Sequence, residues 1–90
     1  MLNPEYSNQF KRDYKKAKAR GKNISSLTTV MDILLNEEPM PPTYRDHQLV
    51  GEWKGFRELH IAPDWLLVYR IADGTVYFTR TGTHADIFEE

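Results

Sequence analysis

The residues best suited to acid–base chemistry are three histidines, all in the second half of the chain: His47, His60 and His84. Histidine is the side chain whose ordinary pKa lets it both accept and donate a proton near neutral pH. Asp64 lies four residues after His60, and Arg80 lies four residues before His84. Cleavage of RNA by its own 2′-hydroxyl group needs a base, an acid and a cation that stabilises the charge on phosphorus. These five residues could provide all three functions without a metal ion.

Each of these residues also has a purely structural interpretation. His60 could be a half-exposed strand residue, His47 a surface loop residue and Asp64 a turn residue. Zinc binding is another chemical interpretation, but the intervals of 13 and 24 residues between the histidines lack the close pair typical of zinc ligands. We therefore predict no metal site and no cofactor. No G-x-S-x-G motif is present, so a serine hydrolase is not indicated.

The composition predicts a single domain over residues 1–90, with no cysteine to form a disulfide or a thiolate metal site. No apolar run of about 18 residues is present, so we expect a soluble, cytoplasmic protein with no membrane partner. The net charge is only −1, but residues 9–22 hold seven cationic side chains and one carboxylate. Helical spacing places four of the lysines on one face, which could meet a polyanion or simply be solvated. They are Lys11, Lys15, Lys18 and Lys22.

The first half of the chain predicts an edge strand and two helices. Pro4 confines a strand over residues 1–6 to the edge of a sheet. Ser7 is a plausible N-cap for a helix over residues 8–20, which Gly21 ends. A second helix is expected to begin at Ser25 or Ser26 and to end near residue 36, with an apolar stripe at core-facing spacing.

The second half predicts strands over residues 56–61, 65–71 and 75–81, with a further short strand near 47–49. The Asp73–Gly74 pair is a strong hairpin signal. The expected fold class is therefore α+β, with two N-terminal helices packed on one face of a small, mainly antiparallel sheet. The other face would stay partly open. We expect residues 80–88 to leave the last strand at Gly82, without forming an ordinary amphipathic helix, and to carry His84 over that open face.

Several motifs in this part of the chain form a familiar combination. They are "YRDHQLVGEWKGFRELHIAPDWLLVYRI" and "TRTGTHADIF", which contain D-H-x-L, W-K-G-[FY]-R, H-x-x-P-D-W and R-T-G-[ST]-H. The chain resembles the YafQ-type toxins of the RelE/ParE toxin–antitoxin superfamily over almost its whole length. The resemblance implies a RelE-like, microbial-RNase-like fold. It also implies a ribosome-dependent endoribonuclease that cuts mRNA in the decoding site and arrests translation.

The usual partners of such a toxin are mRNA on the ribosome and a cognate antitoxin that wraps and inhibits it. Operator DNA is bound only through the complex of toxin and antitoxin. The ParE branch of the superfamily shares the fold but poisons gyrase through protein contacts, which is the alternative function. The histidines of this chain argue against that branch.

The resemblance carries over a set of catalytic residues by motif: His47, His60, Asp64, His84 and Phe88. His84 is expected to be the general acid, while the division of base and phosphate contact between His47 and His60 stays open. Asp64 is expected to orient a histidine, and Phe88 to stack on a nucleobase.

Further RNA contacts are expected outside this set. From its place on the last strand, Arg80 is a candidate for the cation that stabilises the transition state. The lysine face of residues 11–22 would dock on ribosomal RNA through phosphate contacts. Lys54 and Trp65 complete the expected RNA-binding set, although core packing is the alternative role for Trp65.

Overall fold

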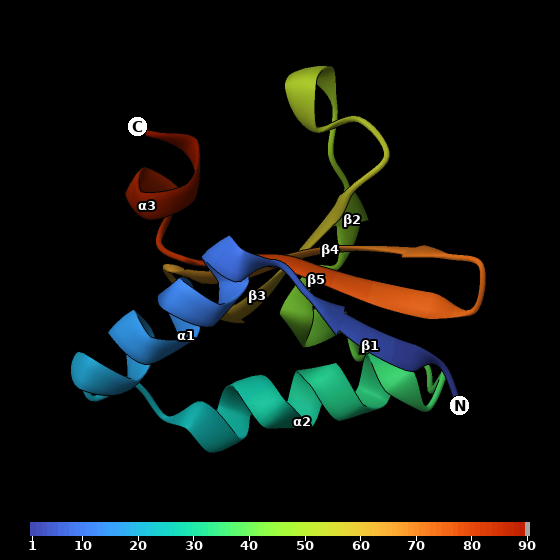
Figure 1. Cartoon of the computed structure of the whole chain (residues 1–90), viewed down its shortest axis with the longest axis horizontal. Coiled ribbons are helices and arrows are strands. Elements are labelled where there is room, and N and C mark those ends of the chain that lie inside the picture. The colour runs from blue at the N-terminus through green and yellow to red at the C-terminus, as the bar shows by residue number, and fades with distance from the viewer. Residues whose placement is uncertain (90) are drawn as a thin grey trace.

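A five-stranded sheet divides the molecule into two layers (Figure 1). The computed structural model describes residues 1–89. The edge strand β1 pairs in parallel with β5, and all other neighbouring strands are antiparallel, which confirms the mainly antiparallel α+β fold. In spatial order the strands are β1 (Asn3–Tyr6), β5 (Thr75–Gly82), β4 (Trp65–Ala72), β3 (Arg57–Ala62) and β2 (His47–Gln48).

Two helices, α1 (Asn8–Ala19) and α2 (Ile24–Leu35), pack on one face of the sheet, as expected. Ser7 caps α1 by accepting a hydrogen bond from the backbone N–H of Phe10. Helix α2 begins at Ile24, slightly before the expected start at Ser25 or Ser26, because Asn23 caps it: its side-chain oxygen accepts from the N–H of Ser25.

The main core lies between these helices and the sheet. Its fully buried members come from both layers, and β4 is covered on both faces along residues 65–69. Burying such aliphatic side chains supplies roughly 1.5–3 kcal/mol each. Its largest contributors include Leu27, Val30, Leu67, Tyr69 and Phe78.

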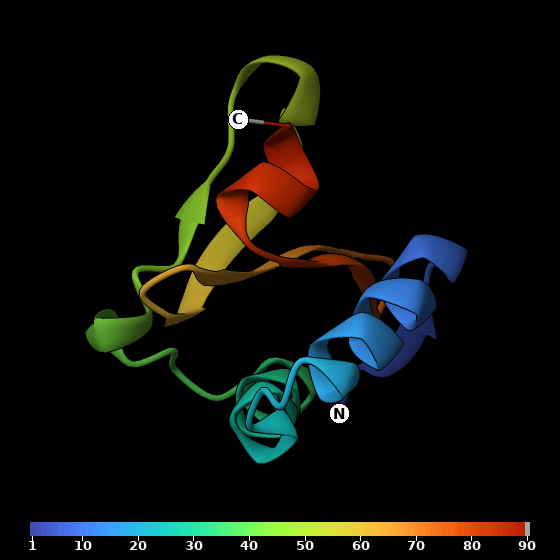
Figure 2. The ribbon, with the colours of Figure 1, turned by 90° about the vertical axis from the view of Figure 1, so that its left-hand side faces the viewer.

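The opposite face of the sheet is covered by a short helix, α3 (His84–Phe88), and by the loop that contains the 3-10 turn Gly51–Trp53 (Figure 2). Ile87 packs there on Leu66 and Val68 of β4. The sequence indicated that this segment forms no ordinary amphipathic helix, and α3 is a single short turn that the sequence analysis did not predict. Thr83 and Asp86 form a reciprocal capping box, which stabilises a helix of only five residues.

Strand β5 contains a β-bulge opposite the middle of β4. Phe78 pairs with Tyr69 and Arg80 pairs with Val68, so Thr79 is the extra residue. Residues directly opposite each other share a face of the sheet. The bulge therefore places Arg80 on the α3 face with Val68, whereas Val76 and Phe78 face the main core.

The β4–β5 hairpin turns at Asp73 and Gly74, which both have positive φ, as the Asp-Gly signal predicts. Within residues 1–89, no helix has both the length and the apolar character that a membrane span requires.

Candidate active site

The three histidines come together on the sheet face that α3 covers. The ring centroids of His47 and His60 are 6.1 Å apart, and those of His60 and His84 are 5.9 Å apart. They arrive on three separate elements: β2, β3 and the first turn of α3. The sequence prediction that distant parts of the chain gather the three imidazoles in one place is confirmed.

A buried carboxylate lies between two of these rings. Glu58 is only 5% exposed, and its Oε2 is 3.2 Å from Nε2 of His47 and 3.6 Å from Nε2 of His60. We call these three residues the histidine–glutamate cluster. Sequence reasoning did not select Glu58, although strand alternation places it on the same face as His60.

The two rings of the cluster differ in their surroundings. Nδ1 of His47 lies 2.7 Å from the carbonyl oxygen of Arg45, so both ring nitrogens of His47 face acceptors. For His60, burial lowers the pKa below its ordinary value, and the nearby charge of Glu58 opposes that effect.

The segment before His47 is anchored to the sheet. The hydroxyl of Tyr69 donates to Asp46 at 2.7 Å, and Nε of Arg57 lies 3.3 Å from the same carboxylate oxygen. Burial and this hydrogen bond raise the pKa of Tyr69 above its ordinary value. Asp46 is therefore held from two strands, and it fixes the backbone that presents His47. Sequence reasoning missed this anchor because its partners are far apart in the chain.

His84 is oriented by Asp64, as expected. Oδ1 of Asp64 accepts from the backbone N–H of His84 at 3.0 Å and lies 2.8 Å from its Nδ1. The hydrogen bond from the backbone, followed by that from the ring, lowers the pKa of Asp64 below its ordinary value. Because Nδ1 faces this carboxylate, Nε2 is the ring nitrogen that can exchange a proton with a substrate.

An open hollow of about 640 Å³ lies beside His60 and His84, with Tyr44 and Arg45 on its other side. Phe88 borders the same region: its ring centroid is 6.4 Å from that of His84 and 5.6 Å from that of Trp53. The histidines are thus partly accessible, and both an aromatic ring and a cationic side chain lie close to them.

Arg80 lies at the junction of three elements. Its Nε is 2.8 Å from Oδ2 of the buried Asp13 on α1, and one terminal nitrogen donates to the carbonyl oxygen of Asp86 on α3. Asp13 also accepts from the backbone N–H of Thr81. Arg80 therefore connects α1, β5 and α3, and its expected contact with phosphate stays a prediction.

Trp65 does not fit the expected RNA-binding set. It is 3% exposed, and its indole N–H donates to the hydroxyl of Thr81 within the core. A buried ring has no face to offer a nucleobase, so the core-packing alternative is the correct one. The Nζ atom of Lys22 lies 5.8 Å from the centroid of the Trp65 ring, and its charge helps to lower the pKa of Asp64. The other expected lysines, Lys54 included, are exposed.

The histidine–glutamate cluster also has the composition of a metal site. One ligand atom from each of its three residues lies within 4.8 Å of the others, so the cluster could hold a metal ion. We predicted no metal site from the wide spacing of the histidines along the chain. That argument was insufficient, because pairing of β2 with β3 brings His47 opposite Glu58. Imidazole and carboxylate ligands suit zinc or copper.

Comparison with known proteins first defines the class: the chain matches, over residues 2–89, the family described as "Bacterial toxin of type II toxin-antitoxin system, YafQ". Within that class, the chain belongs to the YafQ family. It is 46% identical over 85 residues to the mRNA interferase toxin YafQ of Escherichia coli K12, covering 93% of this chain and 92% of that protein.

Solved structures agree with this assignment. YafQ in the E. coli DinJ–YafQ complex has a TM-score of 0.90 and 44% identity, covering 98% of this chain and 99% of that one. A metal-bound toxin from Helicobacter pylori has a TM-score of 0.92 and 40% identity, covering 98% of this chain and all of that one (100%). The described fold is thus the fold of YafQ structures.

Proposed function

We propose that this toxin is an mRNA interferase: an endoribonuclease that cuts mRNA on the ribosome and arrests translation. The observation that carries the proposal is the convergence of His47, His60 and His84, of which His60 and His84 line one open hollow. The name of the E. coli relative, an mRNA interferase, agrees with it. Family membership and the histidines together favour RNA cleavage over the gyrase-directed alternative.

His84 acts as the general acid in this proposal. Asp64 holds the Nδ1 side of the ring, so Nε2 donates a proton to the departing 5′-oxygen. An acid or base positioned in this way contributes on the order of 10²–10⁴-fold to the rate. The ring is also accessible, because His84 lines the hollow.

His60 and His47 divide the two remaining tasks. His60 lines the hollow next to His84 and removes the proton from the 2′-hydroxyl group. His47, whose two ring nitrogens both face acceptors, contacts the scissile phosphate. Glu58 is a positioning residue that fixes both rings and balances their charge. Bond cleavage then leaves a 2′,3′-cyclic phosphate and a free 5′-hydroxyl group, with no metal ion or cofactor needed.

The substrate is held by side chains around the catalytic groups. Phe88 stacks on a nucleobase next to His84, since its ring borders the active site. Lys22 and Lys54 contact phosphates of the RNA. Arg80 keeps its proposed role in stabilising the transition state. Its guanidinium group would then interact with both Asp13 and the phosphate.

The partners follow from the family. E. coli YafQ has been solved in a toxin–antitoxin complex with DinJ. We infer that this toxin has a cognate antitoxin of its own, that the pair binds operator DNA through the antitoxin, and that the free toxin acts on cytoplasmic ribosomes.

Replacement of His84 by alanine tests the proposal. New 5′ ends of mRNA are mapped on translating ribosomes incubated with the purified toxin or with His84→Ala. We expect the variant to lose cleavage by at least 10²-fold while its melting temperature and antitoxin binding stay unchanged. Cleavage by His84→Ala at the wild-type rate would refute the assignment of the acid.

A further inference from the structure

Asp86, in the first turn of α3, joins that helix to α1. Its Oδ1 lies 3.3 Å from Nζ of Lys16, and its Oδ2 lies 3.0 Å from Nη1 of Arg20. Arg20 is the C-cap residue of α1 and follows Lys16 by four positions, so both side chains lie on one face of the helix. We call these three residues the α1–α3 bridge. The bridge supplies neither acid nor base to the chemistry proposed above.

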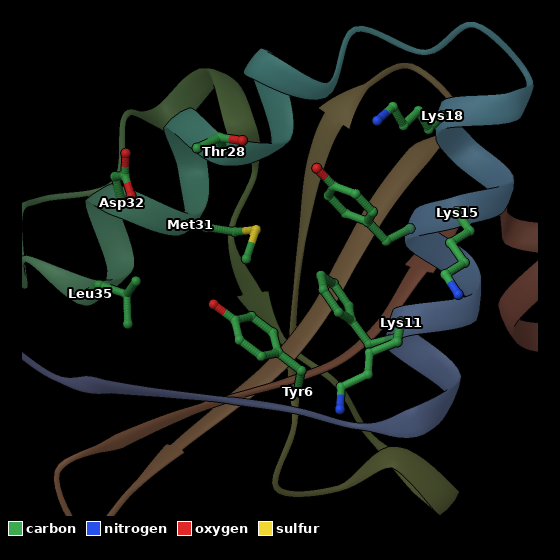
Figure 3. A pocket seen from close by; sticks show the side chains of 10 residues that line it. Tyr6, Lys11, Lys15, Lys18, Thr28, Met31, Asp32 and Leu35 are labelled. Atoms are coloured by element: carbon green, nitrogen blue, oxygen red, sulfur yellow. The ribbon is translucent and has the colours of Figure 1, made fainter.

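The other lysines of α1 lie on a different face. Figure 3 shows Lys11, Lys15 and Lys18 along a hollow between α1 and α2. Within the described residues 1–89, Lys16 is the only lysine that forms an ion pair. The cationic surface of α1 therefore has two parts, and Lys16 belongs to the part that contacts α3.

Asp86 is also fixed to the backbone around it. Its Oδ2 accepts a hydrogen bond from the N–H of Thr83, and its carbonyl oxygen accepts one from Arg80 of β5. A Cβ atom at position 82 would lie only 3.0 Å from Cβ of Asp86, so Gly82 permits this close approach. A displacement of the Asp86 side chain would therefore disturb the whole first turn of α3.

Helix α3 depends on contacts outside itself. It has five residues, and a helix of this length is not stable alone. Residues two positions apart in an α-helix point to nearly opposite sides, so His84 and Asp86 are anchored from different directions. Asp64 holds His84 through its backbone and its ring, while the α1–α3 bridge holds Asp86. Ile87 buries a further side against β4.

We propose that Asp86 is a positioning residue for RNA cleavage. Because Lys16 and Arg20 hold it, α3 keeps the orientation in which the ring of His84 meets Asp64 and leaves its Nε2 free for the substrate. The inference rests on the proposed role of His84 as the general acid. Small displacements of a catalytic group slow a reaction even when the fold survives.

The expected effect is moderate, because the bridge is partly exposed. The side chains of Lys16 and Arg20 are 53% and 47% exposed, and ion pairs at such exposure contribute little individually. Two cations on one carboxylate act together, so we expect their joint loss to lower the rate of cleavage roughly three- to tenfold.

Neutral substitutions on both sides of the bridge test the proposal. One variant is Lys16→Gln/Arg20→Gln, and the other is Asp86→Asn, whose amide oxygen can still accept from Thr83. Single-turnover cleavage of mRNA on programmed ribosomes, followed over a range of toxin concentrations, separates the maximal rate from the half-saturating concentration. Each variant should lower the maximal rate and leave the half-saturating concentration unchanged. Combining all the substitutions should slow cleavage no further, because they break the same contacts.

Controls separate positioning from stability. Lys16→Arg keeps the cation and should cleave like the wild type. Arg12→Gln removes a cation of α1 outside the bridge, where Arg12 contacts Gln9, and should also cleave like the wild type. Melting curves check that every variant is folded at the assay temperature. The ¹⁵N shifts of the His84 ring report its bond to Asp64, and they should change in both bridge variants but in neither control.

Three results would overturn the proposal. The first is an unchanged maximal rate in both bridge variants. The second is a higher half-saturating concentration at an unchanged maximal rate, which would make Lys16 and Arg20 ribosome contacts instead. The third is a further loss of rate when the substitutions are combined, since the groups would then act separately. If the wild-type toxin cuts no mRNA, the proposed function fails, whereas the ¹⁵N shifts of His84 still decide whether the bridge positions its ring.

Discussion

Replacement of Glu58 by glutamine should separate the charge of the histidine–glutamate cluster from its packing. Glutamine has nearly the shape of glutamate, and its amide can still form hydrogen bonds to His47 and His60. The substitution removes the negative charge that faces both imidazoles. We expect cleavage to fall while the fold survives, because the side chain remains large enough to fill its site.

The size of the effect follows from the distance between Glu58 and His47. When His47 is protonated, it and Glu58 are two unit charges 3.2 Å apart, which attract with about 5 kcal/mol at an effective dielectric constant of about 20 and with about 1 kcal/mol in water. Glu58 is buried, but the side chain of His47 is 48% exposed, so an intermediate value of about 3 kcal/mol is appropriate. If Glu58→Gln removes about 3 kcal/mol of stabilisation from the transition state, cleavage slows about 10²-fold.

Single-turnover cleavage of mRNA on programmed ribosomes measures this effect. Glu52→Gln is the matched control, because Glu52 is an exposed glutamate outside the cluster. An NMR titration of His60 provides an independent readout: the charge of Glu58 raises the pKa of His60 against the effect of burial, so Glu58→Gln should lower it further. Cleavage by Glu58→Gln within threefold of the wild type would refute the role of this charge.

Three further predictions follow. If Asp64 acts only through His84, the single variant Asp64→Asn should cleave more slowly than the wild type. The double variant Asp64→Asn/His84→Ala should then cleave at the same rate as His84→Ala, which single-turnover measurements can check. Hydrogen bonds, chiefly from the backbone of Thr83, lower the pKa of Asp86, so its stabilisation is complete above about pH 4 and is lost as the pH falls further. Asp86→Asn should therefore lose about 1 kcal/mol at pH 7 in urea unfolding, and the difference should shrink in acid. Chelators should leave cleavage intact, whereas added Zn²⁺ or Cu²⁺ should inhibit it by occupying the histidine–glutamate cluster, as dose–response assays can establish.

Most of the fold could be predicted because its signals are local. Ser7 as an N-cap, the apolar stripe of α2 and the Asp-Gly turn each depend on neighbouring residues, and the structure confirms all three. Helix α3 was missed because five residues carry little periodicity. Its one signal, the pair Thr83 and Asp86 at capping-box spacing, was present in the sequence.

The candidate site could be predicted only in part. Motifs pointed to the three histidines and Asp64, whose side chains do meet. Glu58 was not selected because a carboxylate in an alternating strand gives no sign of a functional role until the residues on its partner strand are known. Spacing along the chain was also insufficient evidence against a metal site, because β-pairing, which sequence intervals do not reveal, decides which potential ligands are neighbours. Trp65 did not belong in the RNA-binding set, and its place in an almost continuous apolar run already favoured the core packing that the structure shows.

The extra residue in β5 lets this strand lose one residue without changing its register. Deleting Thr79 would remove the bulge but leave Arg80 opposite Val68 and Thr81 opposite Leu67, so both would keep their faces of the sheet. The segment from Arg80 to His84 would keep its length, and His84 should still reach Asp64. Natural variation in this family should therefore tolerate the loss of the bulged residue more readily than a change in the number of residues between Arg80 and His84.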